Sequence, residues 1–257
     1  MNLLRQINLR SVETDSLVGA PFSAVLGYPR CSMDELTSRV NELKVNGVHA
    51  IIFEGTSMIG KLNVVGKGCV SVVVKATTNG TVIALKIRRT DAGRQTMERE
   101  ARFLELANKV DVGPKLIRGS KNFLLMEFID GTSLFRYLEK ENGMDSIRKA
   151  ASEILDQCYR LDEMGLDHGE LSDMREHIII ADNGKITIID FESASTNRRV
   201  SNVTASTQYL FIGGAFAKNN RKLLKIRSID PIIESLREYK KNVSKENFER
   251  LKQTLSL

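Results

Sequence analysis

The sequence predicts an α+β fold, and three stretches of the chain carry this prediction. Residues 64–75 read as a strand, a glycine-containing turn and a second strand. Residues 81–86 form an apolar, β-branched run directly after Asn79-Gly80, a pair typical of tight hairpin turns. Residues 95–110 carry apolar side chains at helical steps. Together these stretches indicate a fold that mixes strands and helices.

The first sixty residues predict a βαβ-like element. Residues 22–28 and 48–53 read as strands, and between them Ser32 and Glu35 form a capping box that opens a helix to about Lys44. This element either docks a partner or substrate, or extends a neighbouring sheet.

Lys86 lies inside an apolar strand run, where a charged group needs a partner or a route to solvent. The predicted helix that follows offers three acidic candidates, Glu98, Glu100 and Glu105. A buried lysine paired with a helix carboxylate is therefore expected.

The turn before this strand contains Gly66 and Gly68, with the small Ser71 nearby. Glycine permits backbone torsions closed to other residues and lets backbone amides approach phosphate groups closely. A plain hairpin with a glycine turn explains the same residues equally well.

Acidic residues mark two later positions. Asp190 follows the apolar residues 188–189, and Glu170 follows Asp167-His168-Gly169. A carboxylate fixed at a strand end is suited to hold a Mg²⁺ ion that bridges nucleotide phosphates. A turn-forming aspartate is the alternative interpretation of Asp190 taken alone.

In this order, these features resemble the protein-kinase-like superfamily over residues 62–192. The chain is most similar to small atypical archaeal kinases, the predicted serine/threonine kinases related to the RIO and KEOPS-type enzymes, in which His-Gly-acid replaces His-Arg-Asp. The resemblance implies a bilobal α+β fold. Residues 1–60 would be an extra N-terminal element, residues 61–130 the N-lobe with its hinge, and residues 131–257 a reduced C-lobe with a basic helical tail.

The resemblance also implies ATP and Mg²⁺ as cofactors, with Mn²⁺ as a second candidate ion. Lys86 would bind the α- and β-phosphates, Glu100 would orient Lys86, and Asp190 would hold the metal. Residues 124–131 would be the strand and hinge against which adenine stacks, with Met126 at the gatekeeper position. The residues expected to bind the nucleotide are Gly66, Lys67, Gly68, Ser71, Lys86, Glu100, Met126, Glu127 and Phe128.

The departures from the family pattern concern the loop after His168. Glu170 occupies the place of the catalytic aspartate, and the family's metal-binding asparagine would fall on Arg175, which cannot ligate a cation. A loop extended by two residues moves that place to His177 and restores the interval to Asp190. We therefore expect His177 as a metal ligand beside Asp190.

The predicted activity is that of an atypical ATP-dependent protein kinase, which transfers the γ-phosphoryl group to Ser or Thr hydroxyls of a protein substrate, including its own. Lys86, Glu170 and Asp190 are the expected catalytic residues, and Asp173 competes with Glu170 for the role of base. Three alternatives stay open: a small-molecule kinase of the aminoglycoside or choline type, an ATPase switch acting with an RNA or protein partner, and a pseudokinase.

The chain between the hinge and His168 bears on the first alternative. It has room for two helices, at residues 133–141 and 145–164. The resemblance implies that small-molecule kinases usually insert a larger helical region here, so this length favours a protein kinase.

Positive charge is concentrated near the end of the chain. Residues 218–252 contain eleven Lys or Arg and five Asp or Glu, which accounts for a charge of +6, the net charge of the whole chain. Such a basic helical tail is suited to contact RNA or a ribonucleoprotein. A solvated helix face is the alternative, because Tyr239 and Phe248 are the aromatic residues in this stretch.

Composition sets the remaining expectations. A chain of 257 residues with 42% apolar residues can bury a full core. Cys31, Cys69 and Cys158 are odd in number and widely spaced, which indicates reduced thiols and predicts a cytoplasmic protein. No stretch reads as a signal peptide or a membrane span, so we expect no membrane partner.

Overall fold

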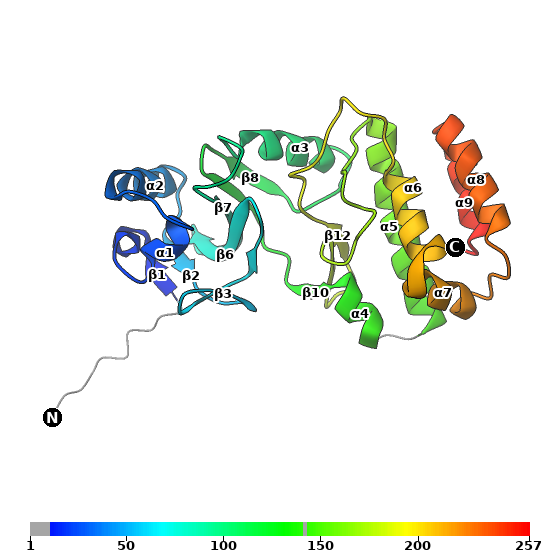
Figure 1. Ribbon diagram of the computed structural model, residues 1–257, viewed down its shortest axis with the longest axis horizontal. Helices are drawn as coiled ribbons and strands as arrows, with labels where there is room; N and C mark the ends of the chain where they lie inside the picture. Colours follow the sequence, from blue (N-terminus) through cyan, green and yellow to red (C-terminus); the bar gives the residue numbers. More distant parts are fainter. Residues whose placement is uncertain (1–10, 141–142) are drawn as a thin grey trace. The chain divides into compact units, whose positions relative to one another are not determined.

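The computed structural model describes residues 11–140 and 143–257 (Figure 1). This part of the chain divides into two compact units. Unit 1 contains the described residues up to Arg102 together with Lys115–Phe128, and unit 2 contains Phe103–Pro114 and Ile129–Leu257. Each unit combines helices with antiparallel strands, so the α+β prediction is confirmed.

An antiparallel sheet forms the centre of unit 1. Its strands run in the order β1-β2-β6-β7-β9-β8, and β5 pairs with β6. Their bounds are β1 (Ser11–Glu13), β2 (Ala50–Ile52), β5 (Gly66–Lys67), β6 (Ser71–Thr78), β7 (Thr81–Arg88), β8 (Leu116–Gly119) and β9 (Phe123–Glu127). Unit 1 also contains a small hairpin of β3 (Ser57–Ile59) and β4 (Leu62–Val64).

The predicted hairpin turn joins β6 to β7. Asn79 and Gly80 have positive φ values of 48° and 76°, as a two-residue turn of type I′ requires. Every second residue of β7 faces the same core. Ile83, Leu85 and Ile87 are buried there in one cluster with residues of helix α2. Successive side chains of a strand point to opposite faces, so Lys86 projects from the other face of the sheet.

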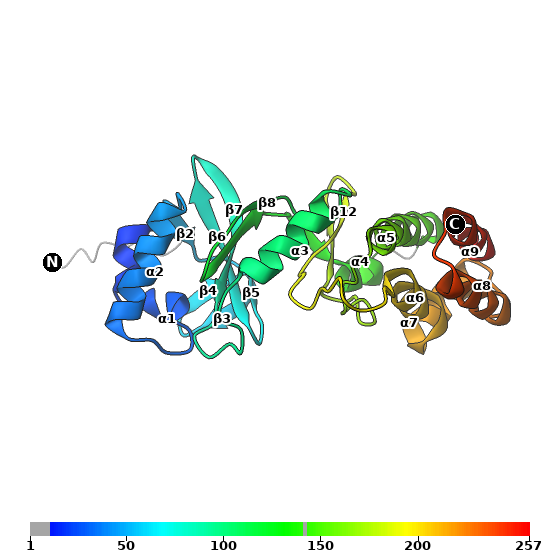
Figure 2. The ribbon, with the colours of Figure 1, turned by 90° about the horizontal axis from the view of Figure 1, so that it is seen from above.

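Helix α2 (Met33–Val45) covers the first face (Figure 2). The predicted cap is confirmed, since Ser32 Oγ accepts a hydrogen bond from Glu35 N at 3.2 Å. Arg39 of α2 is fully buried and donates to the carbonyl oxygens of Leu26 and Arg88 at 2.9 and 2.7 Å. These bonds attach the N-terminal helices to strand β7.

The predicted strand at residues 22–28 is wrong. This stretch forms the short helix α1 (Ser23–Leu26), whose backbone bonds are local, such as Gly27 N to Ser23 O at 2.9 Å. Another short helix, η1 (Thr14–Val18), precedes it. A short apolar run cannot distinguish a strand from a buried helix by periodicity alone, and here the place beside β2 is taken by β1.

The N-terminal residues therefore extend the sheet of unit 1. Strand β2, which was predicted at residues 48–53, pairs with β1 on one side and with β6 on the other. Of the two roles considered for the first sixty residues, extension of a neighbouring sheet is the one these pairings support.

Unit 2 is built mainly of helices. Helices α4 (Leu134–Lys140) and α5 (Met144–Met164) lie where two helices were predicted, and α5 ends at Gly165 with a left-handed φ of 77°. The other helices are α6 (Asn202–Thr207), the π-helix η2 (Gln208–Ile212), α7 (Gly214–Leu223), α8 (Asp230–Lys241) and α9 (Lys245–Thr254). Strands β10 (Gly131–Ser133), β11 (Ile178–Ala181) and β12 (Ile186–Ile188) form a small antiparallel sheet.

The basic tail is helical, as predicted, and α9 packs on α5. The rings of Tyr159 and Phe248 stack with centroids 4.5 Å apart, and Lys252 Nζ bonds Asp156 at 2.8 Å. Helix α3 (Glu98–Asn108) spans the division between the units. Among the residues described, no helix is both long and apolar enough to cross a membrane.

Candidate functional site

Lys86 and Glu100 form a buried ion pair in unit 1. Lys86 lies in the middle of β7, between β6 and β9, and Glu100 lies in the first turn of α3. Lys86 Nζ donates to Glu100 Oε1 at 2.7 Å, and the two residues are 3% and 2% exposed. Of the three acidic candidates on this helix, Glu98 and Glu105 are exposed. The expected lysine and glutamate pair is thus present.

A second cation shares Glu100. Arg94 Nη1 donates to Glu100 Oε2 at 3.1 Å, so the two oxygens of one carboxylate bind two different positive groups. Such charge-assisted bonds hold both long side chains in fixed positions. The sequence pattern did not indicate Arg94, because it lies in the irregular segment before α3.

The glycine turn differs in one respect from expectation. Gly68 N donates to Ser71 O at 2.9 Å and closes a tight turn between β5 and β6, but neither Gly66 nor Gly68 has a positive φ. The expectation that this turn uses torsions closed to other residues is therefore wrong. A Cβ on either glycine would make only ordinary contacts, so their contribution is a bare backbone.

Tyr28 fastens this turn to the N-terminal helices. Lys67 Nζ and Arg89 Cζ each lie 4.9 Å from the centroid of the Tyr28 ring. Arg89 also donates through Nη1 to Gly68 O at 2.9 Å. The ring thereby contacts Lys67, which lies next to the turn, and Arg89, which binds the backbone of the turn.

The predicted hinge residues end strand β9. Met126 pairs with Ala84 and Leu116, and Glu127 N donates to Lys115 O at 2.8 Å. Phe128 receives Lys75 Nζ over its ring at 4.7 Å. Met126 and Glu127 are half-buried at the end of the strand, and Phe128, directly after it, is half-buried as well.

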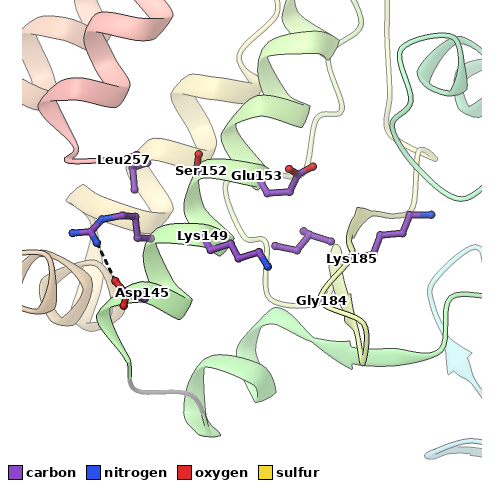
Figure 3. A pocket seen from close by; sticks show the side chains of 9 residues that line it. Asp145, Lys149, Ser152, Glu153, Gly184, Lys185 and Leu257 are labelled. Atoms are coloured by element: carbon purple, nitrogen blue, oxygen red, sulfur yellow. Dashed lines mark hydrogen bonds and ion pairs between the residues drawn. The ribbon is translucent and has the colours of Figure 1, made fainter.

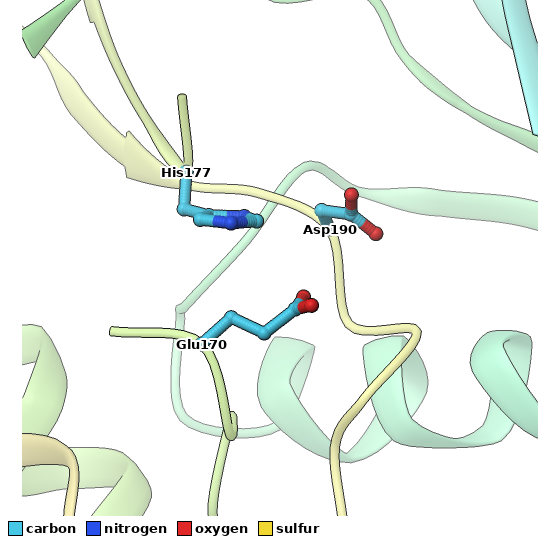
Figure 4. A group of neighbouring side chains, drawn as sticks. All are labelled: Glu170, His177 and Asp190. Atoms are coloured by element: carbon cyan, nitrogen blue, oxygen red, sulfur yellow. The ribbon is translucent and has the colours of Figure 1, made fainter. Parts of the chain in front are cut away.

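Glu170, His177 and Asp190 converge in unit 2 (Figure 4). One ligand atom from each side chain lies within 4.8 Å of those of the other two. His177 precedes β11 and Asp190 follows β12, and the pairing of these strands continues in the bond from Ile189 N to His177 O at 2.9 Å. Asp190 has a φ of 71°, an uncommon left-handed value that aims its carboxylate out of line with the strand.

Two atoms of this group suit a bound cation. Glu170 Oε2 and His177 Nδ1 are buried and have no hydrogen-bond partner in the protein. Buried polar atoms are normally satisfied, so each such atom calls for an explanation. The residues present fit a divalent metal ion, which a carboxylate oxygen and an imidazole nitrogen both ligate.

The loop between Glu170 and His177 contains two successive turns. Asp173 N donates to Glu170 O at 3.2 Å, and His177 N donates to Met174 O at 3.1 Å. These turns lie between Glu170 and His177, and His177 lies beside Asp190.

Asp173 is engaged elsewhere. Both of its carboxylate oxygens bind the exposed Arg175 guanidinium, and this hydrogen bonding lowers the pKa of Asp173 below its usual value. Asp173 lines a cavity of about 580 Å³ together with Glu170 and His177, but it does not join their group. A carboxylate held in this way is a weak base.

His168 supports the loop from beneath. Its Nε2 lies 3.0 Å from Ile189 O, and its backbone N donates to Asn202 Oδ1 at 2.8 Å. Burial lowers the pKa of His168 to about 4, so the ring is neutral at physiological pH. The Phe191 ring packs edge-on against it at 5.0 Å. His168 thus fixes the residue next to Asp190.

Asp167 and Gly169, on either side of His168, contact Arg198. Arg198 Nε bonds the Asp167 carboxylate, and Arg198 Nη2 donates to Ser193 O at 2.7 Å. Gly169 has a φ of 94°, and a Cβ there would lie 2.0 Å from Arg198 Nη2. The backbone angle favours glycine here, and the Ser193 backbone oxygen, 2.8 Å from where a Cβ would lie, leaves little room for a side chain.

The buried hydrogen-bond network around Asp162 was not predicted from the sequence. The Asp162 carboxylate accepts hydrogen bonds from Asn202 N, Asn202 Nδ2, Val203 N and Tyr239 Oη, at 2.8–3.1 Å. Burial raises the pKa of Asp162 to about 6, and these bonds oppose the shift. Asp162 connects helices α5, α6 and α8, and Asn202 passes the connection to His168.

Several cations of the basic tail bind within unit 2. Arg221 donates to Phe211 O and Ile212 O, Lys241 pairs with Glu238, and Arg250 pairs with Glu246. Together with Lys252, which binds Asp156, they are engaged in internal pairs. The pair of Lys252 with Asp156 joins a cation of the tail to an acid outside it, whereas Glu238 and Glu246 are already counted in the tail's charge of +6. Contact with RNA stays a prediction.

The arrangement defines a class of protein. A strand lysine paired with a helix glutamate, a glycine-containing hairpin, and a His-Gly-acid loop before an acidic strand end are the parts of a protein-kinase-like fold. The model of one family, described as the RIO domain, matches residues 49–203. The chain belongs to this family of atypical protein kinases, which as a family use ATP and a divalent metal ion.

A relative supports the match. An uncharacterized protein of Methanocaldococcus jannaschii, MJ1211, is 36% identical over 120 residues, which are 47% of this chain and 99% of the relative. The predicted resemblance to archaeal RIO-related kinases is confirmed.

Proposed function

We propose that the protein is an ATP-dependent kinase that transfers the γ-phosphoryl group to Ser or Thr hydroxyls of a protein substrate, including its own. The observation that carries this proposal is the convergence of Glu170, His177 and Asp190. There a carboxylate that could receive a hydroxyl proton lies beside two side chains that could hold a metal ion.

Each unit supplies one part of the chemistry. In unit 1, the ammonium of Lys86 would bind the α- and β-phosphates while Glu100 fixes its position. The glycine turn would offer bare backbone to the phosphates, and Met126, Glu127 and Phe128 would receive adenine. In unit 2, Asp190 and His177 would hold a divalent ion, which supplies charge neutralisation of the phosphates.

Glu170 would orient the acceptor. The oxygen of the substrate hydroxyl forms a bond to the γ-phosphorus while the bond from that phosphorus to the bridging β,γ-oxygen breaks, and the hydroxyl proton passes to the Glu170 carboxylate. The products are a phosphoester and ADP. Because catalysis of this step is mainly positioning and charge stabilisation, a glutamate in place of an aspartate can perform it.

Radiolabelled ATP with Mg²⁺ or Mn²⁺ tests the proposal. We expect label on protein acceptors in wild type, and loss of at least about 100-fold in Lys86→Ala and Asp190→Ala. Matched controls are Lys121→Ala and Asp182→Ala, which change exposed residues of the same types. Unchanged labelling in either site variant would reject the assignment.

The choice of base and of acceptor needs its own comparison. Glu170→Ala should reduce transfer strongly, and Asp173→Ala should reduce it little, because Arg175 already binds the Asp173 carboxylate. Loss of phosphoryl transfer in the Asp173 variant alone would assign the role of base to Asp173 in place of Glu170. Label on metabolites but not on proteins would favour a small-molecule kinase, and release of phosphate alone would favour an ATPase switch.

A further inference from the structure

We propose that Glu170, His177 and Asp190 form a preformed site for a divalent first-row transition-metal ion, which the protein binds without nucleotide and in preference to Mg²⁺. Glu170 is thereby a third metal ligand as well as a neighbour of the acceptor. This inference deepens the proposed function, and the part that the ion plays in phosphoryl transfer rests on that function. Binding of the ion to the protein is independent of it.

The geometry is close to that of an occupied site. Ligand atoms of the three side chains lie within 4.8 Å of one another, and the side chains of Glu170 and His177 extend toward Asp190 (Figure 4). Ligands at about 2.0–2.2 Å from an ion are separated by up to about 4.4 Å when they stand opposite each other. Small side-chain rotations are therefore sufficient to close the group around an ion.

The backbone holds two of the ligands before any ion binds. Strands β11 and β12 pair in register, and Ile189 N donates to His177 O at 2.9 Å, next to Asp190. His168 holds Ile189 from the other side through its Nε2, 3.0 Å from Ile189 O. A fixed pair of ligands lowers the entropy lost on binding, so the site does not need phosphate oxygens to assemble it.

Two buried atoms independently indicate a ligand. Glu170 Oε2 and His177 Nδ1 have no hydrogen-bond partner in the protein, and each such buried atom costs about 1–3 kcal/mol if left unsatisfied. No hydrogen bond joins these two atoms to each other. A cation satisfies a carboxylate oxygen and an imidazole nitrogen at the same time.

The ligand set determines the kind of ion. Mg²⁺ prefers oxygen ligands and retains several waters, whereas imidazole suits first-row transition metals. His177 therefore selects against Mg²⁺, and two carboxylates supply the negative charge. Three protein ligands leave further positions of a six-coordinate ion for water or phosphate oxygens.

The inference is tested by titrating the full chain with Mn²⁺ in the absence of nucleotide. Binding is measured as the loss of the electron paramagnetic resonance signal of the free ion. We expect one ion per chain, and at least about 10-fold more Mg²⁺ than Mn²⁺ to displace it. His177→Asn, which replaces nitrogen by a neutral oxygen ligand, should weaken Mn²⁺ binding at least about 10-fold and reduce the preference over Mg²⁺. Glu170→Gln should weaken binding of both ions.

Matched controls are His49→Ala and Glu176→Gln, which change exposed residues of the same types, the second in the same loop. Circular dichroism of each variant verifies folding. Wild-type affinity for Mn²⁺ in a folded His177→Asn or Glu170→Gln variant would overturn the inference, as would absence of binding without nucleotide. Mn²⁺ binding without phosphoryl transfer would reject the proposed function alone, and Mg²⁺-supported transfer without Mn²⁺ binding would reject this inference alone.

Discussion

Lys86 Nζ and Glu100 Oε1 are joined by a 2.7 Å ion pair in the interior of unit 1, and Glu100 also binds Arg94 through its other oxygen. Removing one partner of a buried pair typically costs about 3–5 kcal/mol, because the remaining charge keeps its desolvation penalty. Glu100→Gln removes the negative charge that Lys86 and Arg94 share, whereas Lys86→Met leaves Glu100 paired with Arg94.

We therefore expect Glu100→Gln to lower the free energy of unfolding by more than Lys86→Met does, as measured by urea denaturation. Glu238→Gln is the control, because its pair with Lys241 is exposed and solvent screens it. An equal effect of Glu100→Gln and Glu238→Gln would contradict the buried character of the pair.

Tyr28 provides a prediction for nucleotide binding. Its ring contacts Lys67 and Arg89, and each cation–π contact is worth about 0.5–1 kcal/mol. Tyr28→Ala should loosen the glycine turn and raise the KM for ATP about 3–10-fold with little change in kcat. Tyr28→Phe keeps the ring and should behave as wild type. A similar KM in all three proteins would exclude this positioning role.

Two glycines with similar backbone angles should respond differently to alanine. Gly169 and Gly165 have φ values of 94° and 77°, but a Cβ at the first position meets Arg198 and the backbone oxygen of Ser193 at 2.8 Å, and at the second it meets open space. Both substitutions carry the cost of a left-handed alanine, about 1–2 kcal/mol. Gly169→Ala should lower the free energy of unfolding by at least about 2 kcal/mol more, and similar melting temperatures would contradict the contact.

Asp162 predicts a pH dependence. Its pKa of about 6 lies above the ordinary value, so between about pH 4 and 6 the folded state binds more protons than the unfolded state. Stability contributed by Asp162 therefore increases as the pH falls from 7 to 5. His168 acts in the opposite direction, because its pKa of about 4 lies below the ordinary value and folding excludes its proton.

Comparison with Asp162→Asn separates the two effects. The difference in unfolding free energy between wild type and this variant should grow in favour of wild type by about 1–2 kcal/mol from pH 7 to pH 5. Urea denaturation at several pH values measures this difference. A difference that shrinks toward acid would show that the four hydrogen bonds outweigh burial.

Local sequence signals predicted the elements that local chemistry determines. The Asn79-Gly80 turn, the Ser32 cap and the strand at residues 81–86 depend on neighbouring residues, and the structure agrees with each. Spacing also led us to expect His177 beside Asp190, because the interval between them matches that of the kinase-like family, and the two side chains do lie close together. That they bind a metal ion stays a prediction.

Contacts between distant segments could not be found in this way. Tyr28 is about forty residues from Lys67, and Asp162 is forty from Asn202, so no local period relates them. The mistaken strand at residues 22–28 has a related cause, since the choice between strand and helix depended on which segment occupies the edge beside β2.

The pairing of β2 with both β1 and β6 has a practical consequence for shortened proteins. The family match begins at residue 49, but a fragment cut there loses β1 and α2. The open edge of β2 would then present unpaired backbone groups, and the core face that α2 covers would be exposed to solvent. Such a fragment should aggregate. The segment that the family model matches is therefore shorter than the segment that must be present for unit 1 to fold.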